Sequence, residues 1–219
     1  MSKYKLLMLI MFFLCIFTLS KVNASVKNYS LQGKCIYIDP GHGGEDSGAI
    51  SYKFLEKDMN LLLSQLLANE LFRRGAMVYL TRDGDYDLSN SNLNRKRNDL
   101  YSRVKLINRS KCDMYISIHL NSSPSSRWSG LQIFYSNINS NNKEIAKTVT
   151  KNLKNKLSNV RDYKKENDYY MYSKIKVPGI LVEAGFISNS RDNYNIRQEK
   201  YRNNLIKSIA DGISEYFNN

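Results

Sequence analysis

The chain has 219 residues, a formal charge of +13 at pH 7, three cysteines and only two histidines. Its length fits one domain with its own hydrophobic core, and the absence of a Cys-x-x-Cys pair excludes a zinc site built on thiolates. The excess of basic residues indicates either attraction to polyanions, such as wall polymers or lipid headgroups, or only a well-solvated surface, so the charge alone selects no function.

Residues 1–24 have the layout of a secretory signal, with two early lysines, an apolar run over 6–19 and a small residue, Ala24, at the expected cleavage point. The run is shorter than the roughly 20 residues of a membrane span, although an uncleaved signal anchor is the alternative. We therefore expect an exported protein with a short linker at 25–33 and one catalytic domain at 34–219. The first 24 residues hold three lysines and no acidic residue, so the remaining chain carries +10.

Short apolar runs alternate with helical patterns along the rest of the chain. Strands are expected at 35–39, 76–81, 114–118, 131–135 and 177–182. Apolar residues at helical spacing predict helices around 59–66 with an end near Gly75, and around 100–107, 145–153 and 205–216. Polar, turn-rich loops are expected at 83–94, 121–129, 136–142 and 158–168. This alternation predicts an α/β fold: a single domain with a mostly parallel twisted sheet and helices on both faces.

Two further expectations concern particular side chains in these elements. The helix around 100–107 is expected to carry four arginines on the sides away from its apolar residues: Arg95, Arg97, Arg103 and Arg109. Cys15 belongs to the signal, and Cys35 and Cys112 are expected to be buried free thiols, with a disulfide as the alternative in an exported protein.

Three residues suited to metal or acid–base chemistry follow strand-like runs. His42 lies in "YIDPGHGGEDSGA", His119 ends "MYISIH", and Glu183 follows the apolar run of "GILVEAGFISN". Because the carboxyl ends of parallel strands meet at one edge of a sheet, we expect these side chains to converge there. The alternatives are hydrogen-bonded structural histidines and a glutamate that caps a helix or forms a salt bridge. However, a carboxylate after a buried run is costly to ionise without a cation nearby.

Two imidazoles and one carboxylate form a typical ligand set for catalytic zinc, which leaves the fourth position to water. Spacing alone does not identify the carboxylate, because Glu45, Asp46, Glu56 and Asp58 all lie close to His42 in the sequence. The first two could equally cap the glycine-rich turn. A phosphate-binding loop at "GHGG" is disfavoured, since no helix is expected to start directly after it.

From about residue 34 to the C-terminus the chain resembles the zinc-dependent N-acetylmuramoyl-L-alanine amidases of bacterial cell-wall turnover. The resemblance rests on four motifs in order: "IDPGHGG", "LEKDMNLLLSQLLANELFRRGAMVYLTR", "SIHLNSS" and "VPGILVEAGFISN". It implies that His42, Glu56 and His119 bind Zn²⁺ and that Glu183 is the catalytic acid–base. It also implies hydrolysis of the amide between the lactyl group of N-acetylmuramic acid and L-alanine, with peptidoglycan and no nucleic acid as the macromolecular partner.

The same resemblance suggests roles for residues around the ligands. Arg82 and Asn121 match family positions near the groove, where they would bind substrate or support the ligands. Asp39 is expected to orient the turn that holds His42, because metal-bound imidazoles usually lean on a hydrogen-bond acceptor. Asp58 is expected to cap the helix that begins a few residues after Glu56.

The layout, with a catalytic domain soon after the signal, is similar to that of sporulation-type members of the family. This likeness implies processing of spore cortex peptidoglycan before muramic lactam forms, which germination requires. It also implies a location outside the cytoplasmic membrane, in the forespore intermembrane space, and points to an activating lipoprotein partner. The alternatives are a vegetative cell-separation or lysis amidase, a non-catalytic wall-binding module that kept the fold, and a zinc deacetylase or peptidase.

Overall fold

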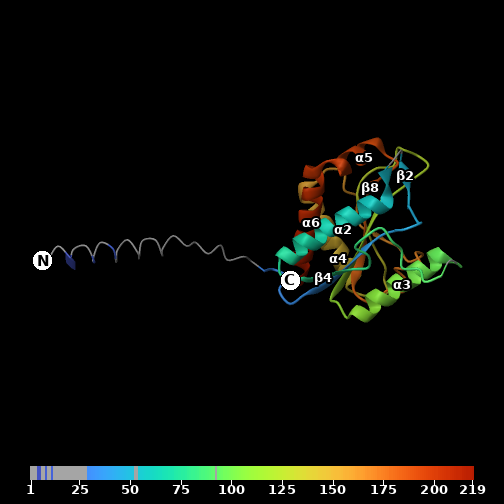
Figure 1. Cartoon of the computed structure of the whole chain (residues 1–219). Helices are drawn as coiled ribbons and strands as arrows, with labels where there is room; N and C mark the ends of the chain where they lie inside the picture. The colour runs from blue at the N-terminus through green and yellow to red at the C-terminus, as the bar shows by residue number, and fades with distance from the viewer. Residues whose placement is uncertain (1–3, 6–7, 9–10, 12–28, 52–53, 92) are drawn as a thin grey trace.

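The computed structural model describes residues 29–51, 54–91 and 93–219, together with residues 4, 5, 8 and 11 (Figure 1). Its strands are β1 (Cys35–Pro40), β2 (Ile50–Ser51), β3 (Phe54–Leu55), β4 (Met77–Leu80), β5 (Met114–Asn121), β6 (Gln132–Tyr135), β7 (Lys164–Lys165) and β8 (Gly179–Phe186). Its helices are α2 (Glu56–Arg73), α3 (Arg95–Ser110), α4 (Asn142–Lys156), α5 (Ser190–Arg197) and α6 (Glu199–Asn218).

Six strands form one sheet in the order β4-β1-β5-β8-β6-β7. All neighbouring pairs run parallel except β6 and β8, which are antiparallel. The predicted α/β fold with a mostly parallel sheet is therefore confirmed. Strands β2 and β3 form a separate two-stranded hairpin that directly precedes α2.

Helices cover both faces of the sheet, as predicted. On one face α2, α4 and α6 enclose the larger core, which includes Ile36, Ile116 and Val182 from the strands. On the opposite face lie α3 and the segment 169–177, which pack on Tyr115 and Leu181 (Figure 1). Because side chains alternate along a strand, the odd-numbered residues of β1, β5 and β8 face α3. The candidate site residues Asp39, His119 and Glu183 lie on this face.

Helix α2 positions one end of the site through its packing. Its buried side holds Met59, Leu63, Leu67 and Leu71, at the spacing of one helical face, and each buried leucine contributes about 1.5–3 kcal/mol. The helix ends at Arg73, and Gly75 follows with φ of 94°. The predicted end near Gly75 is thus confirmed, and a glycine suits this left-handed conformation.

Several elements differ from the sequence prediction. Strands β5 and β8 extend beyond the predicted apolar runs, so His119 and Glu183 lie within them and pair in register rather than following them. Polar residues fit inside these strands because their side chains face a cavity instead of the core. Strand β7 lies in the predicted loop 158–168, and the short helix α5, capped by the side chain of Asn189, was not predicted.

A disulfide joins Cys35 and Cys112, whose Cα atoms are 4.6 Å apart. The expectation of two free thiols is therefore wrong. The two residues meet because β1 and β5 are adjacent in the sheet, and Asp113 N–H donates to the Cys35 carbonyl at 2.8 Å. The strand order, which the apolar pattern does not reveal, brings the cysteines together at the amino-terminal edge of the sheet.

Most of the predicted signal at 1–24 lies outside the described residues. Among those that are described, no helix is long and apolar enough to cross a membrane. The end of the predicted linker, residues 29–33, packs against the domain: Leu31 is fully buried and its N–H donates to the Arg74 carbonyl at 2.9 Å.

Candidate metal centre and active site

The glycine-rich turn after β1 holds His42 in the left-handed region, with φ of 61°. Histidine tolerates this conformation better than most side chains, but a surrounding framework must impose it. Gly43 N–H donates to the Asp46 carbonyl at 3.0 Å, and Arg103 Nη2 donates to the His42 carbonyl at 2.6 Å. These bonds direct the imidazole toward β5.

His42, Glu56 and His119 converge from three separate elements: the turn after β1, the first residue of α2, and β5. Glu56 Oε1 lies 3.1 Å from His42 Nε2 and 3.0 Å from His119 Nδ1. The three candidate ligand atoms all lie within 4.8 Å of one another. The structure therefore brings together the three residues that were expected to bind metal.

The Glu56 carboxylate is fixed by three further groups. Its Oε2 accepts the Ala49 N–H at 2.9 Å, and its Oε1 accepts the Leu120 N–H and Asn60 Nδ2, each at 3.2 Å. The Glu56 N–H itself donates to the Ala49 carbonyl at 3.0 Å. Asn60 also donates to the Gly41 carbonyl at 3.2 Å, so one buried amide ties α2 to the turn that holds His42.

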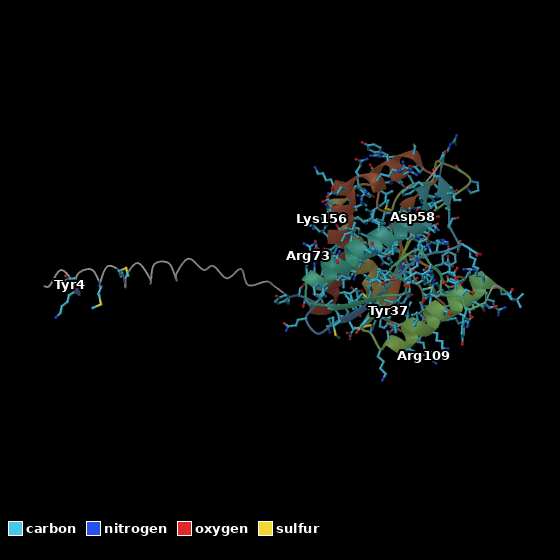
Figure 2. The ribbon with its side chains drawn as sticks, viewed as in Figure 1. Tyr4, Tyr37, Asp58, Arg73, Arg109 and Lys156 are labelled. Atoms are coloured by element: carbon cyan, nitrogen blue, oxygen red, sulfur yellow. A yellow bond between two sulfur atoms is a disulfide. The ribbon has the colours of Figure 1, made fainter. Side chains whose placement is uncertain are left out.

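Helix α2 begins at Glu56 rather than a few residues later, and its N-cap residue is Leu55, which forms no side-chain cap. The expectation that Asp58 caps this helix is therefore wrong. Asp58 is exposed on the first turn (Figure 2), where a negative charge stabilises the helix only through its dipole.

Two glycines allow this close approach. A Cβ atom at Gly41 would overlap the His119 ring. At Gly48, whose φ is 65°, a Cβ atom would lie 2.6 Å from Glu56 Oε2 and 2.7 Å from His42 Cδ2. The "GHGGEDSG" stretch is therefore rich in glycine because backbone must pass directly against the three ligands.

Asp46 sets the protonation of His42. Its Oδ2 lies 2.8 Å from His42 Nδ1, and an ionised carboxylate only accepts, so Nδ1 carries the hydrogen. The second nitrogen, Nε2, faces Glu56 at 3.1 Å and would offer its lone pair to a metal ion bound between them. Asp39 was expected to be this acceptor; the structure gives that position to Asp46.

The electrostatics of the cluster favour a positive charge. Burial lowers the pKa of His42, but hydrogen bonds to Asp46 and Glu56 outweigh it and raise the pKa to about 9. Burial raises the pKa of Glu56, yet the neighbouring histidines hold it well below its ordinary value. The hydrogen bond from His42 likewise lowers the pKa of Asp46. A metal cation bound between the imidazoles and Glu56 would balance the carboxylate charge in the same way as the second proton on His42 does.

Asp39 acts through a buried arginine. Its carboxylate accepts from Thr81 Oγ1 at 2.7 Å, Ser117 Oγ at 2.7 Å and Arg103 Nη1 at 2.8 Å. Arg103 is 1% exposed and donates to the carbonyls of Pro40 and His42. The expectation that Arg103 lies on an outer side of its helix is wrong. Asp39 does orient the turn around His42, but only through Arg103.

Arg82 is also buried, at 1% exposure, and its guanidinium donates to four backbone carbonyls: those of Pro40, Gly41, Lys57 and Gly84. With its donors engaged in this way, it supports the turn and does not present a charge to a ligand. Asn121 ends β5, and its side chain accepts the Ser122 N–H at 2.8 Å. It does not line the cavity described next.

A cavity of about 320 Å³ opens on the α3 side of the sheet edge. It is lined by residues of the site, of α3 and of the segment Tyr169 to Tyr172, among them His42, His119, Glu183, Lys96 and Leu100. Arg103, which sequence reasoning did not assign to the site, and Asp46, which it left open as an alternative carboxylate ligand or cap of the turn, also line it. Arg103 was expected on the side of α3 away from its apolar residues, so only the tertiary packing reveals its role.

Glu183 faces this cavity from β8, opposite His119 in the register of the sheet. It is 9% exposed, and among the described residues its buried Oε2 has no hydrogen-bond partner. Burial raises the pKa of Glu183, and the nearby charge of Glu56 raises it further, to about 8, against the opposing effect of His42. A carboxylate with these properties is suited to accept and return a proton near neutral pH.

Comparison with known proteins gives the family. The family model for N-acetylmuramoyl-L-alanine amidase matches residues 36–215. The chain belongs to this family. Within the amidase family it is 42% identical over 202 residues to the germination-specific N-acetylmuramoyl-L-alanine amidase of Bacillus subtilis, with 89% of this chain and 85% of the relative covered.

Two other family members are similar over most of this amidase chain. It is 37% identical over 201 residues to the probable cell wall amidase LytH of Staphylococcus aureus, covering 89% of this chain and 62% of that protein. The solved structure of the CwlD amidase from Clostridioides difficile in complex with the GerS lipoprotein has a TM-score of 0.80 and 31% identity. That comparison covers 84% of this chain and 98% of the other.

Proposed function

We propose that this amidase hydrolyses the bond between the lactyl group of N-acetylmuramic acid and L-alanine of the stem peptide, with a Zn²⁺ ion held by His42, Glu56 and His119. The observation that carries the proposal is the meeting of the chain's only two histidines with Glu56, beside a cavity that Glu183 also lines. A non-catalytic wall-binding module has no physical need for this combination.

The three side chains fit zinc. A tetrahedral site with bonds of about 2.0–2.1 Å has ligands about 3.3 Å apart. The separations of 3.0 and 3.1 Å between Glu56 and the two imidazoles are close to that value, and the ligand atoms of the two imidazoles lie within 4.8 Å of each other. Two nitrogens, one carboxylate and an adjoining cavity are the donor set of catalytic zinc. When bound, the ion supplies Lewis acidity that polarises the scissile carbonyl and acidifies water.

Glu183 is proposed to take a proton from the attacking water and deliver it to the departing L-alanine nitrogen. Its unpaired Oε2 is free to receive the proton, and its buried setting favours the neutral form that must then donate it. A cation bound by Glu56 would compensate its charge, and Glu183 would then lose its proton more readily at the start of the cycle. Asp46 holds the Nδ1–H of His42 throughout.

The test is digestion of purified spore cortex and vegetative sacculi by the wild-type protein, Glu183→Gln and an exposed control, Glu144→Gln. We expect Glu183→Gln to keep wild-type metal content and lose about 10²–10⁴-fold in rate or more, while the control and wild type release stem peptides starting at L-alanine. A chelator should abolish release. Near-normal turnover of Glu183→Gln would reject the catalytic assignment, and mass spectrometry showing a different cleaved bond would favour a deacetylase or peptidase.

Spore cortex is the proposed substrate, because the Bacillus subtilis relative carries a germination-specific name at 42% identity. The Staphylococcus aureus relative, a probable cell wall amidase, supports the vegetative alternative. Muropeptide analysis of cortex from a deletion strain distinguishes the two. Loss of muramic lactam is expected for cortex processing, and an unchanged lactam content would leave the vegetative role.

We further propose that residues 1–24 direct export, that 34–219 form the catalytic domain, and that the protein acts outside the cytoplasmic membrane, in the forespore intermembrane space. Because the similar CwlD was solved with the GerS lipoprotein, a lipoprotein is the proposed partner here too. Amino-terminal sequencing of the exported protein should find Ser25 if the signal is cleaved. An intact Met1 would indicate the anchor instead.

A further inference from the structure

A second hollow continues the catalytic cavity along α3. It has a volume of about 600 Å³ and is lined by Asn94, Arg95, Lys96, Arg97, Leu100 and Tyr170. Lys96, Leu100 and Tyr170 line both hollows. The two therefore form one groove that runs from the candidate metal ligands to the first turn of α3. We call the outer part, lined by these six residues, the α3 groove.

The α3 groove is cationic. Three of its six lining residues are consecutive basic residues, and none is acidic. The charge of Arg95 is balanced by Asp87 at 2.7 Å and Glu45 at 2.9 Å. Lys96 is 70% exposed and meets Asp46 only loosely, at 3.6 Å, while Asp46 is engaged with His42 at 2.8 Å. Arg97 is exposed. The positive charges of Lys96 and Arg97 are therefore available to bind an anion in the groove.

We propose that the α3 groove binds the free carboxylates of the peptidoglycan stem peptide and so sets which side of the cleft the peptide occupies. The inference rests on the proposed function. Once the lactyl group is amidated, the glycan of this substrate carries no charge, whereas the peptide carries carboxylates on its second residue, D-glutamate, and beyond. The cationic side of the site matches the peptide, and the glycan enters from the other side.

The distances suit this assignment. Asp46 connects Lys96 to His42: its Oδ2 lies 3.6 Å from Lys96 Nζ and 2.8 Å from His42 Nδ1. The carboxylate of D-glutamate lies two residues from the scissile bond, a span of at most about 7 Å. Lys96 is thus placed for the second residue of the peptide, and Arg97, further out, for a later carboxylate. Tyr170, 39% exposed, supplies an apolar surface for the peptide backbone between them.

A binding measurement tests the proposal without relying on catalysis. The probe is the free peptide L-Ala-γ-D-Glu-diaminopimelate, titrated into wild type, Lys96→Gln, Arg97→Gln and the double variant. The D-isoglutamine peptide, which lacks only the D-glutamate carboxylate, is the counterpart. Matched controls on the same helix are Lys105→Gln and Arg109→Gln, which lie outside both hollows; Arg109 is at the far end of α3 (Figure 2).

We expect the double variant to bind the acidic peptide about fivefold more weakly, since exposed charge pairs contribute modestly, and the difference should shrink at high salt. Binding of the amidated peptide, which keeps the diaminopimelate carboxylates, should change less than twofold in Lys96→Gln, and the controls should match wild type. Equal weakening of both peptides by Lys96→Gln, equal weakening by the controls, or no binding of the acidic peptide to wild type would overturn the proposal.

Kinetics on disaccharide-tripeptides with D-glutamate or D-isoglutamine separate this proposal from the proposed function. If the enzyme is an amidase and the groove reads carboxylates, Lys96→Gln should raise KM for the D-glutamate substrate alone and leave kcat nearly unchanged. Cleavage of both substrates with no selective change in KM would reject only the groove. Absence of any cleavage would reject the proposed function, while the peptide titration would still report on the groove.

Discussion

At the scale of single residues, the carboxylate of Asp46 fixes the orientation of the His42 ring. Its Oδ2 accepts the Nδ1 hydrogen at 2.8 Å, and its Oδ1 accepts the Gly48 N–H at 3.2 Å. The same carboxylate therefore fixes the imidazole and closes the glycine-rich turn. Acceptors of this kind fix the ring orientation of a ligating histidine and increase its basicity.

Asp46→Asn should weaken metal binding about 10–100-fold, because the amide replaces a charged acceptor by a neutral one. The measurement is a competition titration with a chromophoric chelator at pH 7. Asp58→Asn, on the exposed side of α2, is the control and should bind metal as wild type does. An unchanged metal affinity of Asp46→Asn would show that the turn alone orients His42.

The sequence was informative about these residues to different degrees. Two scarce histidines after strand-like runs pointed to one site, and the structure brings them together with Glu56. Spacing could not choose Glu56 over Asp46, because that choice depends on how the turn folds back onto α2. The buried state of Arg82 and Arg103 was equally inaccessible, since their partners are carbonyls and a carboxylate far away in the chain.

At the scale of elements, a buried ion pair joins α3 to β1. Arg103 is held between Asp39 at 2.8 Å and Asp99 at 2.8 Å, and it extends to the turn that carries His42. Burial raises the pKa of Asp39, but the Arg103 charge and the hydroxyls of Thr81 and Ser117 outweigh it and hold the pKa below its ordinary value. The pair therefore couples the stability of α3 to the geometry of the site.

Asp39→Asn should reduce the free energy of unfolding at pH 7 by about 3 kcal/mol or more, because it leaves a buried cation short of a partner. Since the pKa of Asp39 is lowered on folding, its contribution is present above about pH 4 and is lost as the pH falls through the folded value. Urea unfolding at several pH values should show the gap to wild type narrowing in acid. A gap that is constant with pH would contradict the ion-pair assignment.

Element prediction succeeded where apolar periodicity was strong. Helices α2, α3, α4 and α6 follow the predicted patterns, and so do strands β1, β4, β5, β6 and β8. Strand β7, two exposed lysines, has no apolar signal, and α5 has a single fully buried apolar residue, Ile196. The antiparallel direction of β6 also lies outside any local pattern, because it depends on the path of the chain around the sheet.

At the scale of the whole molecule, the disulfide and the candidate metal site lie at opposite edges of the sheet. The disulfide between Cys35 and Cys112 lies where β1 and β5 begin, and the candidate ligands lie where the same strands end. It closes a segment of sequence separation 77, which includes Glu56 and His42. The crosslink thus restricts the unfolded chain without touching the cavity.

Replacing both cysteines by alanine should lower the free energy of unfolding by about 2–4 kcal/mol, through the greater freedom of the unfolded chain. Metal affinity and turnover at 25 °C should stay within about twofold of wild type, since the site is at the opposite edge. Thermal unfolding with and without reductant checks the first statement, because reductant should destabilise wild type and leave the double variant unchanged. A large loss of metal affinity in the folded double variant would show that the two edges are coupled.

The central claim is that His42, Glu56 and His119 bind one zinc ion beside Glu183. The most direct measurement is X-ray diffraction from crystals of the purified protein at energies just above and just below the zinc absorption edge. We predict one anomalous difference peak, present only above the edge, within bonding distance of the three side chains. A peak at another position, or no peak in protein that cleaves peptidoglycan, would contradict it.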